Sequence, residues 1–220
     1  ASYSLYSSEG GAARDLLTNS GTMIGKVELF GGNDLYDGRS GMINSGVFGG
    51  EGNDRLYGGK ENNSLYGNGG ADKLYGGLGK DILSGGSQDD QLFGDDGDDR
   101  LDGGDGKDRL TGGLGRDTLR GGAGNDTYVI DNSDTLSETT TGGMDAVSFD
   151  GSVDLRKFAN IENLVLTGVK AIIATGNSTG NSITGNSAAK VLWGGKGSDV
   201  LEGGAGADTF HFVRGDGRDT

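Results

Sequence analysis

Acidic side chains recur every nine residues through the middle of the chain. Nine consecutive nine-residue units run from Gly49 to Val129, from GGEGNDRLY to GGAGNDTYV. Their sixth positions hold Asp54, Asn63, Asp72, Asp81, Asp90, Asp99, Asp108, Asp117 and Asp126. A carboxylate can act as a general acid or base, or it can bind a hard cation. Because nearly all of these acids fall on one repeated position, the pattern favours cation binding over a catalytic carboxylate pair.

An apolar residue follows two positions later, at the eighth position of each unit. It is leucine in the first eight units and Tyr128 in the ninth. Glycines at positions one, two and four permit positive φ and close backbone approach, so we expect the first six residues to form a tight turn. Positions seven to nine are expected to form a short strand with the eighth residue inward. Two units then make an eighteen-residue coil, and stacked coils place two parallel sheets across a thin leucine core.

The eighteen-residue coil predicts two columns of stacked acids. Asp54, Asp72, Asp90, Asp108 and Asp126 form the first column, and Asn63, Asp81, Asp99 and Asp117 form the second. Carboxylates about 5 Å apart repel each other unless a cation lies between them. Carboxylate oxygens and turn carbonyls would form an all-oxygen cage, which suits Ca²⁺ better than Zn²⁺ or the strictly octahedral Mg²⁺. The same spacing should stack Tyr57 on Tyr75, with Tyr66 on the other face.

The composition agrees with a chain that needs bound cations to fold. Glycine supplies 48 of 220 residues, hydrophobic residues only 32%, and 33 acids outnumber 19 basic residues to give a net charge of −14. One leucine per unit is too little apolar area to offset the cost of ordering nine residues. The absence of cysteine excludes a disulfide scaffold, a zinc finger and a thiol nucleophile. The charge makes nucleic acid a poor partner, and we expect no transmembrane segment because no apolar run is long enough.

The motif GGxGxD followed by an apolar eighth residue resembles the repeats-in-toxin (RTX) family, whose members carry hemolysin-type calcium-binding repeats. The resemblance implies an all-β fold, a right-handed parallel β-roll or β-solenoid of GGxGxDxUx units, with several Ca²⁺ ions as its cofactors. It also implies six oxygens around each ion. Positions two, four and six of one unit would face positions one, three and six of the unit eighteen residues later.

Carried onto this chain, the resemblance implies six strong metal sites. Their facing sets are Gly50, Gly52 and Asp54 with Gly67, Gly69 and Asp72; Asn68, Gly70 and Asp72 with Gly85, Ser87 and Asp90; Gly86, Gln88 and Asp90 with Gly103, Asp105 and Asp108; Gly104, Gly106 and Asp108 with Gly121, Ala123 and Asp126; Gly77, Gly79 and Asp81 with Gly94, Asp96 and Asp99; and Asp95, Gly97 and Asp99 with Gly112, Leu114 and Asp117. Weaker sites are expected near Asn63, Asp199 or Asp208.

The pattern divides the chain into four segments. Residues 1–48 are expected to be irregular lead-in coils, with Asp34 in an imperfect turn whose loss should matter little. Residues 49–129 form the calcium-binding block, and residues 130–175 a β-rich continuation without the repeat. Residues 176–220 restore the spacing, but Asn181 and Lys190 take the sixth position in two units and weaken the sites there. The chain ends inside the pattern, so we expect it to be part of a longer protein.

We therefore expect a calcium-binding repeat module of a secreted bacterial protein. The resemblance implies type I secretion from a Gram-negative cell, folding on extracellular Ca²⁺, and a structural or secretion-assisting role beside other domains of a longer parent protein. The chain shows no catalytic constellation: GNSTG at 176–180 fits a nucleophile elbow, but His211 is the single histidine. The alternative is the non-catalytic repeat portion of a secreted enzyme, of lipase, alginate epimerase, glycanase or protease type, or of an adhesin.

Overall fold

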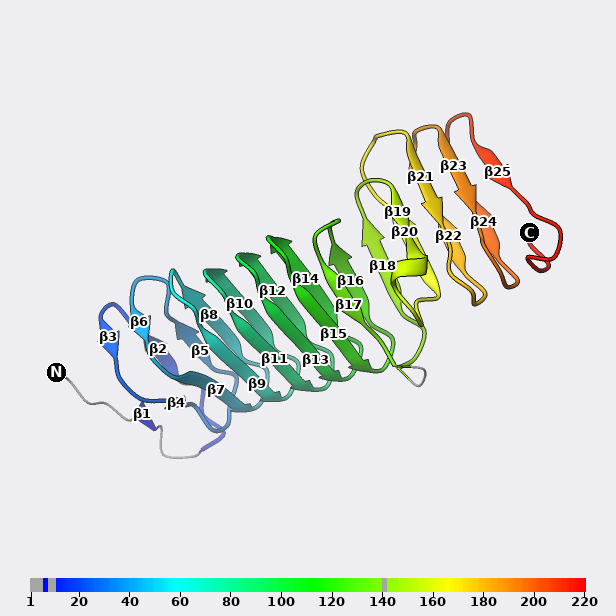
Figure 1. Cartoon of the computed structure of the whole chain (residues 1–220). Coiled ribbons are helices and arrows are strands. Elements are labelled where there is room, and N and C mark those ends of the chain that lie inside the picture. Colours follow the sequence, from blue (N-terminus) through cyan, green and yellow to red (C-terminus); the bar gives the residue numbers. More distant parts are fainter. Residues whose placement is uncertain (1–5, 8–10, 140–141) are drawn as a thin grey trace.

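The chain forms one elongated stack of coils. The computed structural model describes residues 6–7, 11–139 and 142–220, so residues 1–5 and 8–10 of the expected lead-in lie outside the described part. The coils follow one another along a single axis from the N-terminal to the C-terminal end (Figure 1). Apart from one 3-10 turn, η1 (Leu155–Lys157), the described regular elements are strands, and the solenoid has about 11 turns. The predicted all-β parallel solenoid is therefore confirmed. No helix in the described part is long and apolar enough to cross a membrane.

The strands belong to two long parallel sheets and two small ones. The first long sheet holds β1 (Tyr6–Ser7), β4 (Val27–Glu28), β7 (Gly46–Glu51), β9 (Ser64–Gly69), β11 (Ile82–Ser87), β13 (Arg100–Asp105), β15 (Thr118–Ala123) and β17 (Thr135–Ser137). The second holds β2 (Leu16–Thr18), β5 (Leu35–Asp37), β8 (Arg55–Gly59), β10 (Lys73–Leu78), β12 (Gln91–Asp96), β14 (Arg109–Leu114), β16 (Thr127–Ile130), β18 (Ala146–Phe149), β20 (Asn163–Leu166), β22 (Ser182–Thr184) and β24 (Val200–Glu202). The small sheets hold β19 (Val153–Asp154), β21 (Ile172–Thr175), β23 (Lys190–Trp193) and β25 (Thr209–His211), and β3 (Thr22–Met23) with β6 (Met42–Ile43).

The register between neighbouring coils is eighteen residues throughout the repeat block. Lys73 pairs with Arg55 on one side and with Gln91 on the other. Outside the block the offset changes to twenty between β5 and β8, seventeen between β15 and β17, and nineteen between β16 and β18. The strands stay aligned because the extra or missing residues fall in the loops between them.

The strands are longer than the three residues expected from the pattern. β10 runs through positions seven to nine of one unit and positions one to three of the next. The predicted six-residue turn is therefore wrong, and only positions four to six turn. The first glycine of each unit lies within a strand, and the second, except Gly59, adopts a left-handed backbone, as at Gly104 with φ of 113°. Asn68 and Asp95 replace that glycine yet keep positive φ of 77° and 71°, which short polar residues tolerate.

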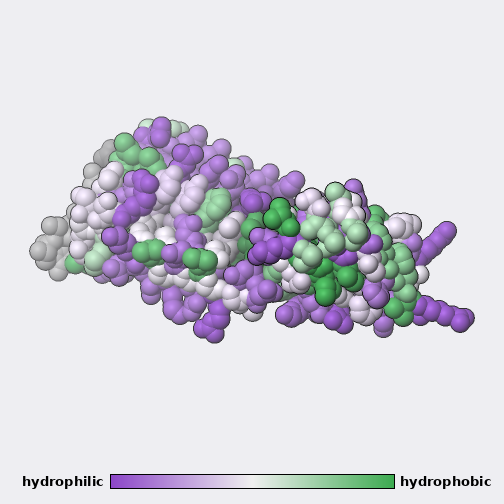
Figure 2. All heavy atoms as spheres, turned by 90° about the horizontal axis from the view of Figure 1, so that it is seen from above, coloured by the Kyte–Doolittle hydropathy of each residue, from purple (hydrophilic) through white to green (hydrophobic). Residues whose placement is uncertain are grey.

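The eighth positions form the core. Each of the leucines from Leu56 to Leu119 at this position is at most 1% exposed, and Tyr128 continues their line into the C-terminal coils. On the outer faces of the sheets, Tyr57 stacks on Tyr75 at 4.7 Å between ring centroids, as predicted, and Tyr66 stacks on Phe48. Hydrophilic residues run along the whole visible face in Figure 2, with broader hydrophobic patches over the C-terminal half. The acidic block is thus stabilised by one narrow row of leucines and by contacts between turns.

We expect Leu110→Ala to lower the free energy of unfolding by about 2–5 kcal/mol even at saturating Ca²⁺, because it leaves a cavity in a core one side chain wide. Denaturant titration at fixed Ca²⁺ measures the loss. Ile82→Ala, at a position 43% exposed, is the matched control and should stay within about 0.5 kcal/mol of the parent. Equal losses for the two variants would contradict the leucine core.

Candidate metal centre

The sixth-position residues stack in two columns, as predicted. Hydrogen bonds between main chain and side chain connect each member to the next coil. The first column runs through Asp15, Asp34, Asp54, Asp72, Asp90, Asp108, Asp126, Asp145, Glu162, Asn181, Asp199 and Asp219. The second runs through Asn63, Asp81, Asp99, Asp117 and Asp134. Both columns therefore extend beyond the nine units.

Asp90 shows how the coils fix each carboxylate. Its Oδ1 accepts the backbone N–H of Asp72 at 2.7 Å, and its own backbone N–H donates to Oδ1 of Asp108 at 2.8 Å. Its carbonyl oxygen accepts the N–H of Arg109 at 2.9 Å. The side chain therefore has one defined position, with one oxygen directed to the preceding coil.

The other carboxylate oxygen, Oδ2, is buried and has no hydrogen-bond partner. This holds for Asp34, Asp54, Asp72, Asp81, Asp90, Asp99, Asp108, Asp117, Asp126, Asp145 and Asp199, none of which is more than 3% exposed. Burying an unpartnered polar atom is costly, and burying an unpaired charge more so. Each of these turns therefore presents an oxygen that a cation could satisfy.

A first-position carbonyl lies beside this oxygen, and a second-position carbonyl lies against the neighbouring glycine. A Cβ built on Gly103 would lie 2.3 Å from Oδ2 of Asp108 and 2.7 Å from the carbonyl oxygen of Gly121 in the next coil. A Cβ on Gly104 would lie 2.1 Å from the carbonyl oxygen of Gly86 in the preceding coil. The glycines are required here because any larger side chain would fill the space that these oxygens surround.

Third- and fourth-position carbonyls complete the donor set. A Cβ on Gly106 would lie 2.3 Å from the carbonyl oxygen of Gln88. The N–H of Gly106 donates to the carbonyl oxygen of Ala123 at 2.7 Å, and that oxygen keeps a second lone pair. Each gap between turns thus offers carboxylate and carbonyl oxygens alone, which is the donor chemistry that Ca²⁺ prefers. The residues present fit calcium.

Burial shifts the titration of these aspartates in the metal-free chain. Desolvation is the largest cause and raises the pKa of Asp90 to about 8, and the pKa of Asp54 and of Asp72 to about 7. The backbone N–H that each carboxylate accepts lowers the pKa, whereas stacked neighbours such as Asp108 raise the pKa of Asp90 further. Near neutral pH the empty column therefore holds protons that a bound cation must displace.

A third carboxylate joins the first column at the end of the repeat block. Ligand oxygens of Asp126, Glu138 and Asp145 all lie within 4.8 Å of one another. One Glu138 oxygen accepts the N–H groups of Gly121 and Gly122 and the hydroxyl of Tyr128. A Cβ on Gly142 would lie 2.4 Å from the other Glu138 oxygen and 3.3 Å from Oδ2 of Asp145. This junction therefore has one more negative charge than a standard turn.

The structure brings together the facing turns of all six predicted strong sites. Their units pair in the expected register, as for Gly86 with Gly104 and Asp95 with Gly113. Asn63 also faces Asp81, and its amide oxygen accepts the N–H of Gly59. Asp199 lies in the first column, whereas Asp208 forms an ion pair with Lys190 at 3.0 Å.

Spacing alone missed several column members. They are Asp15, Asp134, Asp145, Glu162 and Asp219. Asp134 and Asp145 follow the preceding members by seventeen and nineteen residues, so a fixed period passes over them. Asp34, expected in an imperfect turn, lies in the first column instead: it is 2% exposed, accepts the N–H of Asp15 and carries an unpartnered Oδ2. For these members except Asp219, the signal in the sequence is an acid two positions before an apolar residue, as in Asp145-Ala-Val147.

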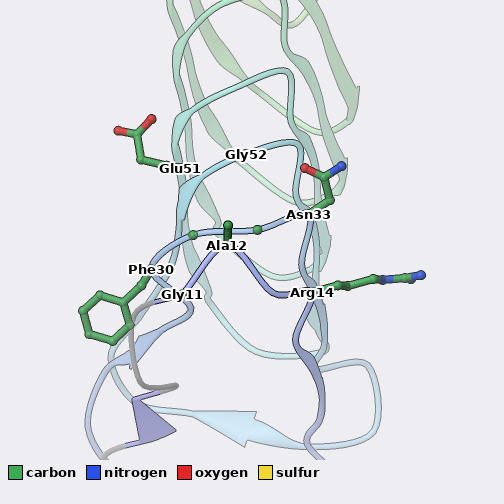
Figure 3. Close-up of a pocket in the computed structure, with 9 residues that line it drawn as sticks. Gly11, Ala12, Arg14, Phe30, Asn33, Glu51 and Gly52 are labelled. Atoms are coloured by element: carbon green, nitrogen blue, oxygen red, sulfur yellow. The ribbon is translucent and has the colours of Figure 1, made fainter.

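Other candidate chemistry does not assemble a catalytic centre in the described part. GNSTG at 176–180 connects β21 to β22, so the turn leads into a strand and lacks the helix of a nucleophile elbow. A cavity of about 780 Å³ lies along the N-terminal turns (Figure 3). Arg14 and Glu51 extend away from each other on its two sides, and its lining contains no histidine, serine or cysteine. This open cavity lies on the outer face of stacked turns whose aspartates belong to the first column.

Parallel coils whose turns repeat a buried carboxylate beside main-chain carbonyl oxygens are the architecture of a calcium-binding β-roll. The family of RTX calcium-binding nonapeptide repeats matches residues 48–83, 75–110, 102–129, 175–210 and 184–220, more than half of the chain. The chain belongs to this family, and its repeats bind Ca²⁺ at many sites. A comparison with curated proteins found no match.

The raised pKa values predict that acid stabilises the metal-free chain. Between about pH 4 and pH 8 the folded columns hold protons that the unfolded chain has released, so the free energy of unfolding falls as pH rises. We expect more β-structure by circular dichroism at about pH 5 than at about pH 8 after metal removal on a chelating resin. With Ca²⁺ present the trend should reverse, since the ion needs deprotonated carboxylates. A metal-free chain that gains β-structure as pH rises would contradict this assignment.

Proposed function

We propose that this chain is a folding module controlled by Ca²⁺ in a secreted bacterial protein. It stays unfolded at the low Ca²⁺ concentration of the cytoplasm, leaves a Gram-negative cell by type I secretion, and folds on extracellular Ca²⁺. The folded roll then supports the neighbouring domains of a longer protein. RTX repeats are typical of secreted bacterial proteins, which supports the location.

The observation that carries this proposal is the unpartnered, buried Oδ2 atom repeated from coil to coil. Without a cation, folding would place stacked carboxylates in a water-poor interior or force them to take up protons. The leucine core provides one side chain per unit to oppose that cost. Ion binding and folding are therefore one equilibrium, as in other metal sites that form only in the folded chain.

We propose that the repeat block, 49–129, holds about six ions between the facing sets predicted from the sequence. Four lie in the first column between Asp54 and Asp126, and two in the second between Asp81 and Asp117. A further ion lies at the junction between Asp126, Glu138 and Asp145, where three carboxylates meet. Residues 1–48 and 130–175 continue the first column on either side, so calcium dependence reaches beyond the block.

An alternative for the parent protein is a secreted enzyme or adhesin that uses this chain as its non-catalytic repeat portion. Three stacked aromatic rings lie on the outer face of the second long sheet, those of Tyr57, Tyr75 and Phe93. They favour this alternative only weakly, since cross-strand packing explains them. The two roles agree on what this chain does and differ in the activity of its neighbours.

Calcium titration of Asp108→Asn tests the proposal. Asp108 contributes to two stacked sites, so we expect the Ca²⁺ midpoint of folding, followed by far-ultraviolet circular dichroism, to rise at least several-fold. Asp89→Asn removes the same charge from an exposed side chain that belongs to none of the facing sets, and its amide oxygen can still accept the N–H of Lys107, so it is the control, with a midpoint close to the parent's. Mg²⁺ at equal concentration should fold the parent much less well, because its octahedral shell fits these turns poorly.

Two results would overturn the proposal. One is a parent chain that is fully folded in chelator at neutral pH. The other is a Ca²⁺ midpoint shifted equally by Asp108→Asn and Asp89→Asn, because net charge rather than the column would then be responsible. Anomalous scattering that placed ions between units nine residues apart would refute the coil assignment itself.

We expect Glu138→Gln to weaken the junction ion specifically. The substitution keeps the shape of the side chain but removes the third carboxylate, so Ca²⁺ affinity at this turn should fall. Hydrogen exchange at intermediate Ca²⁺ should show lost protection in β18 and β20, with β10 to β12 unchanged. Glu202→Gln, at an exposed position of β24, is the control. Unchanged protection in β18 after Glu138→Gln would show that Glu138 does not bind the ion.

A further inference from the structure

Lys190 occupies the sixth position of its unit and is completely buried. Its side chain has 0% exposure, beside an Asp208 side chain of 8% exposure. Its backbone N–H donates to Oδ1 of Asp208 at 3.1 Å, the same bond that aspartates make elsewhere in the columns. Lysine is almost never fully buried unless it is paired. This unit therefore keeps the column geometry while replacing an acid by a base.

The ammonium group lies among the oxygens that elsewhere surround the ion space. Nζ of Lys190 donates to the carbonyl oxygens of Asn186 at 2.9 Å, of Ala205 at 3.1 Å, and of Ala188, and it lies 3.0 Å from Oδ1 of Asp208. Asn186 and Ala188 are positions two and four of its own unit. Ala205 and Asp208 are positions three and six of the unit eighteen residues later. These are the positions from which the calcium ligands are proposed in the repeat block.

The path of the side chain leads to the same point. A Cβ on Gly185, the first residue of the unit, would lie 2.6 Å from Cε of Lys190. At the corresponding glycine of a standard unit, Gly103, the nearest side-chain atom is instead Oδ2 of Asp108. The lysine stem thus fills the position of the missing carboxylate, and its charged end extends beyond it into the gap between turns.

We propose that the ammonium of Lys190 takes the place of a calcium ion in this turn, so that the coil closes without metal. The charges balance in both cases: a divalent ion neutralises two carboxylates, and one ammonium neutralises Asp208 alone. Asp208 is then the partner of an internal cation, which replaces our expectation of a weak calcium site at this residue. The inference rests on the proposed positions of the ions in the repeat block.

Neighbouring turns replace metal by side-chain N–H groups in a similar way. The amide nitrogen of Asn181, at position six of the preceding unit, donates to the carbonyl oxygen of Ile161 at 2.8 Å. Those of Asn177 and Asn186, at position two, donate to Ile161 at 2.8 Å and to Thr167 at 3.1 Å. The turns that face the 130–175 segment thus satisfy their carbonyls with donors from the chain itself.

Substitution of Lys190 in the full chain tests the inference. Lys190→Asp restores an acid opposite Asp208, so we expect it to bind one more Ca²⁺ per chain than the parent, measured by equilibrium dialysis with metal analysis. Lys190→Met should bind no additional ion, and at saturating Ca²⁺ it should lose the Trp193 fluorescence of the folded state at lower denaturant than the parent. Trp193 reports locally because it lies on β23 with Lys190. Lys196→Met, at an exposed position, is the matched control and should behave as the parent.

The inference is overturned if Lys190→Asp binds the same number of ions as the parent, or if it does not fold at saturating Ca²⁺, since the rebuilt site should accept the ion. It is also overturned if Lys190→Met unfolds at the same denaturant concentration as Lys196→Met. A parent chain that binds no Ca²⁺ would instead refute the proposed function. Calcium titration of the parent chain therefore distinguishes failure of this inference from failure of the proposed function.

Discussion

At eleven aspartates of the described columns one buried carboxylate oxygen has no partner in the protein, and this constraint determines most of the structure. The oxygen is held in place because its companion, Oδ1, accepts a backbone N–H from the preceding coil. Its surroundings must then remain open, which explains why the first position of each unit is glycine although it lies within a strand and needs no unusual φ. A Cβ at Gly103 would overlap Oδ2 of Asp108. The acidic composition, the glycine content and the parallel stacking all follow from placing a cation against that oxygen.

The sequence predicts this arrangement well where the period is intact and poorly where a loop changes length. In the repeat block the eighteen-residue spacing predicts the columns, the leucine core and the stacking of Tyr57 on Tyr75. Asp134 and Asp145 were missed because the column keeps each backbone N–H aligned with a carboxylate of the next coil, whereas the number of residues between members varies. A loop can gain or lose a residue without disturbing that alignment. Strand length was also mispredicted, since glycine is a poor strand former in general but here permits the close pairing that extends each strand.

The same geometry accepts different positive or donor groups along the chain. In the repeat block it fits Ca²⁺, and without metal the raised pKa of Asp90 shows that a proton can neutralise the same carboxylate. At Lys190 an ammonium occupies the gap, and at Asn181 an amide donates to the carbonyl oxygen below it. A fixed period could locate position six in these units, but it could not show where the lysine side chain would end. The position of its ammonium depends on the carbonyl oxygens of Asn186 and Ala205, which come together only in the folded turn.

At the proposed ion positions neighbouring turns share carboxylates, which couples their ions, and the C-terminal substitutions interrupt this sharing. Asp90 lies between two turns, so an ion in one turn changes the charge that the next turn must neutralise. In the second column the hydrogen-bonded stack of carboxylates extends from Asp81 to Asp134. In the small sheet that contains β23, Ile172 lies in register beside Lys190, so no carboxylate connects that turn to the one before it. A solenoid transmits stability only between neighbouring coils. On the Lys190 side the coil therefore carries its own cation, whereas its other side remains part of the first column through Asn181 and Asp199.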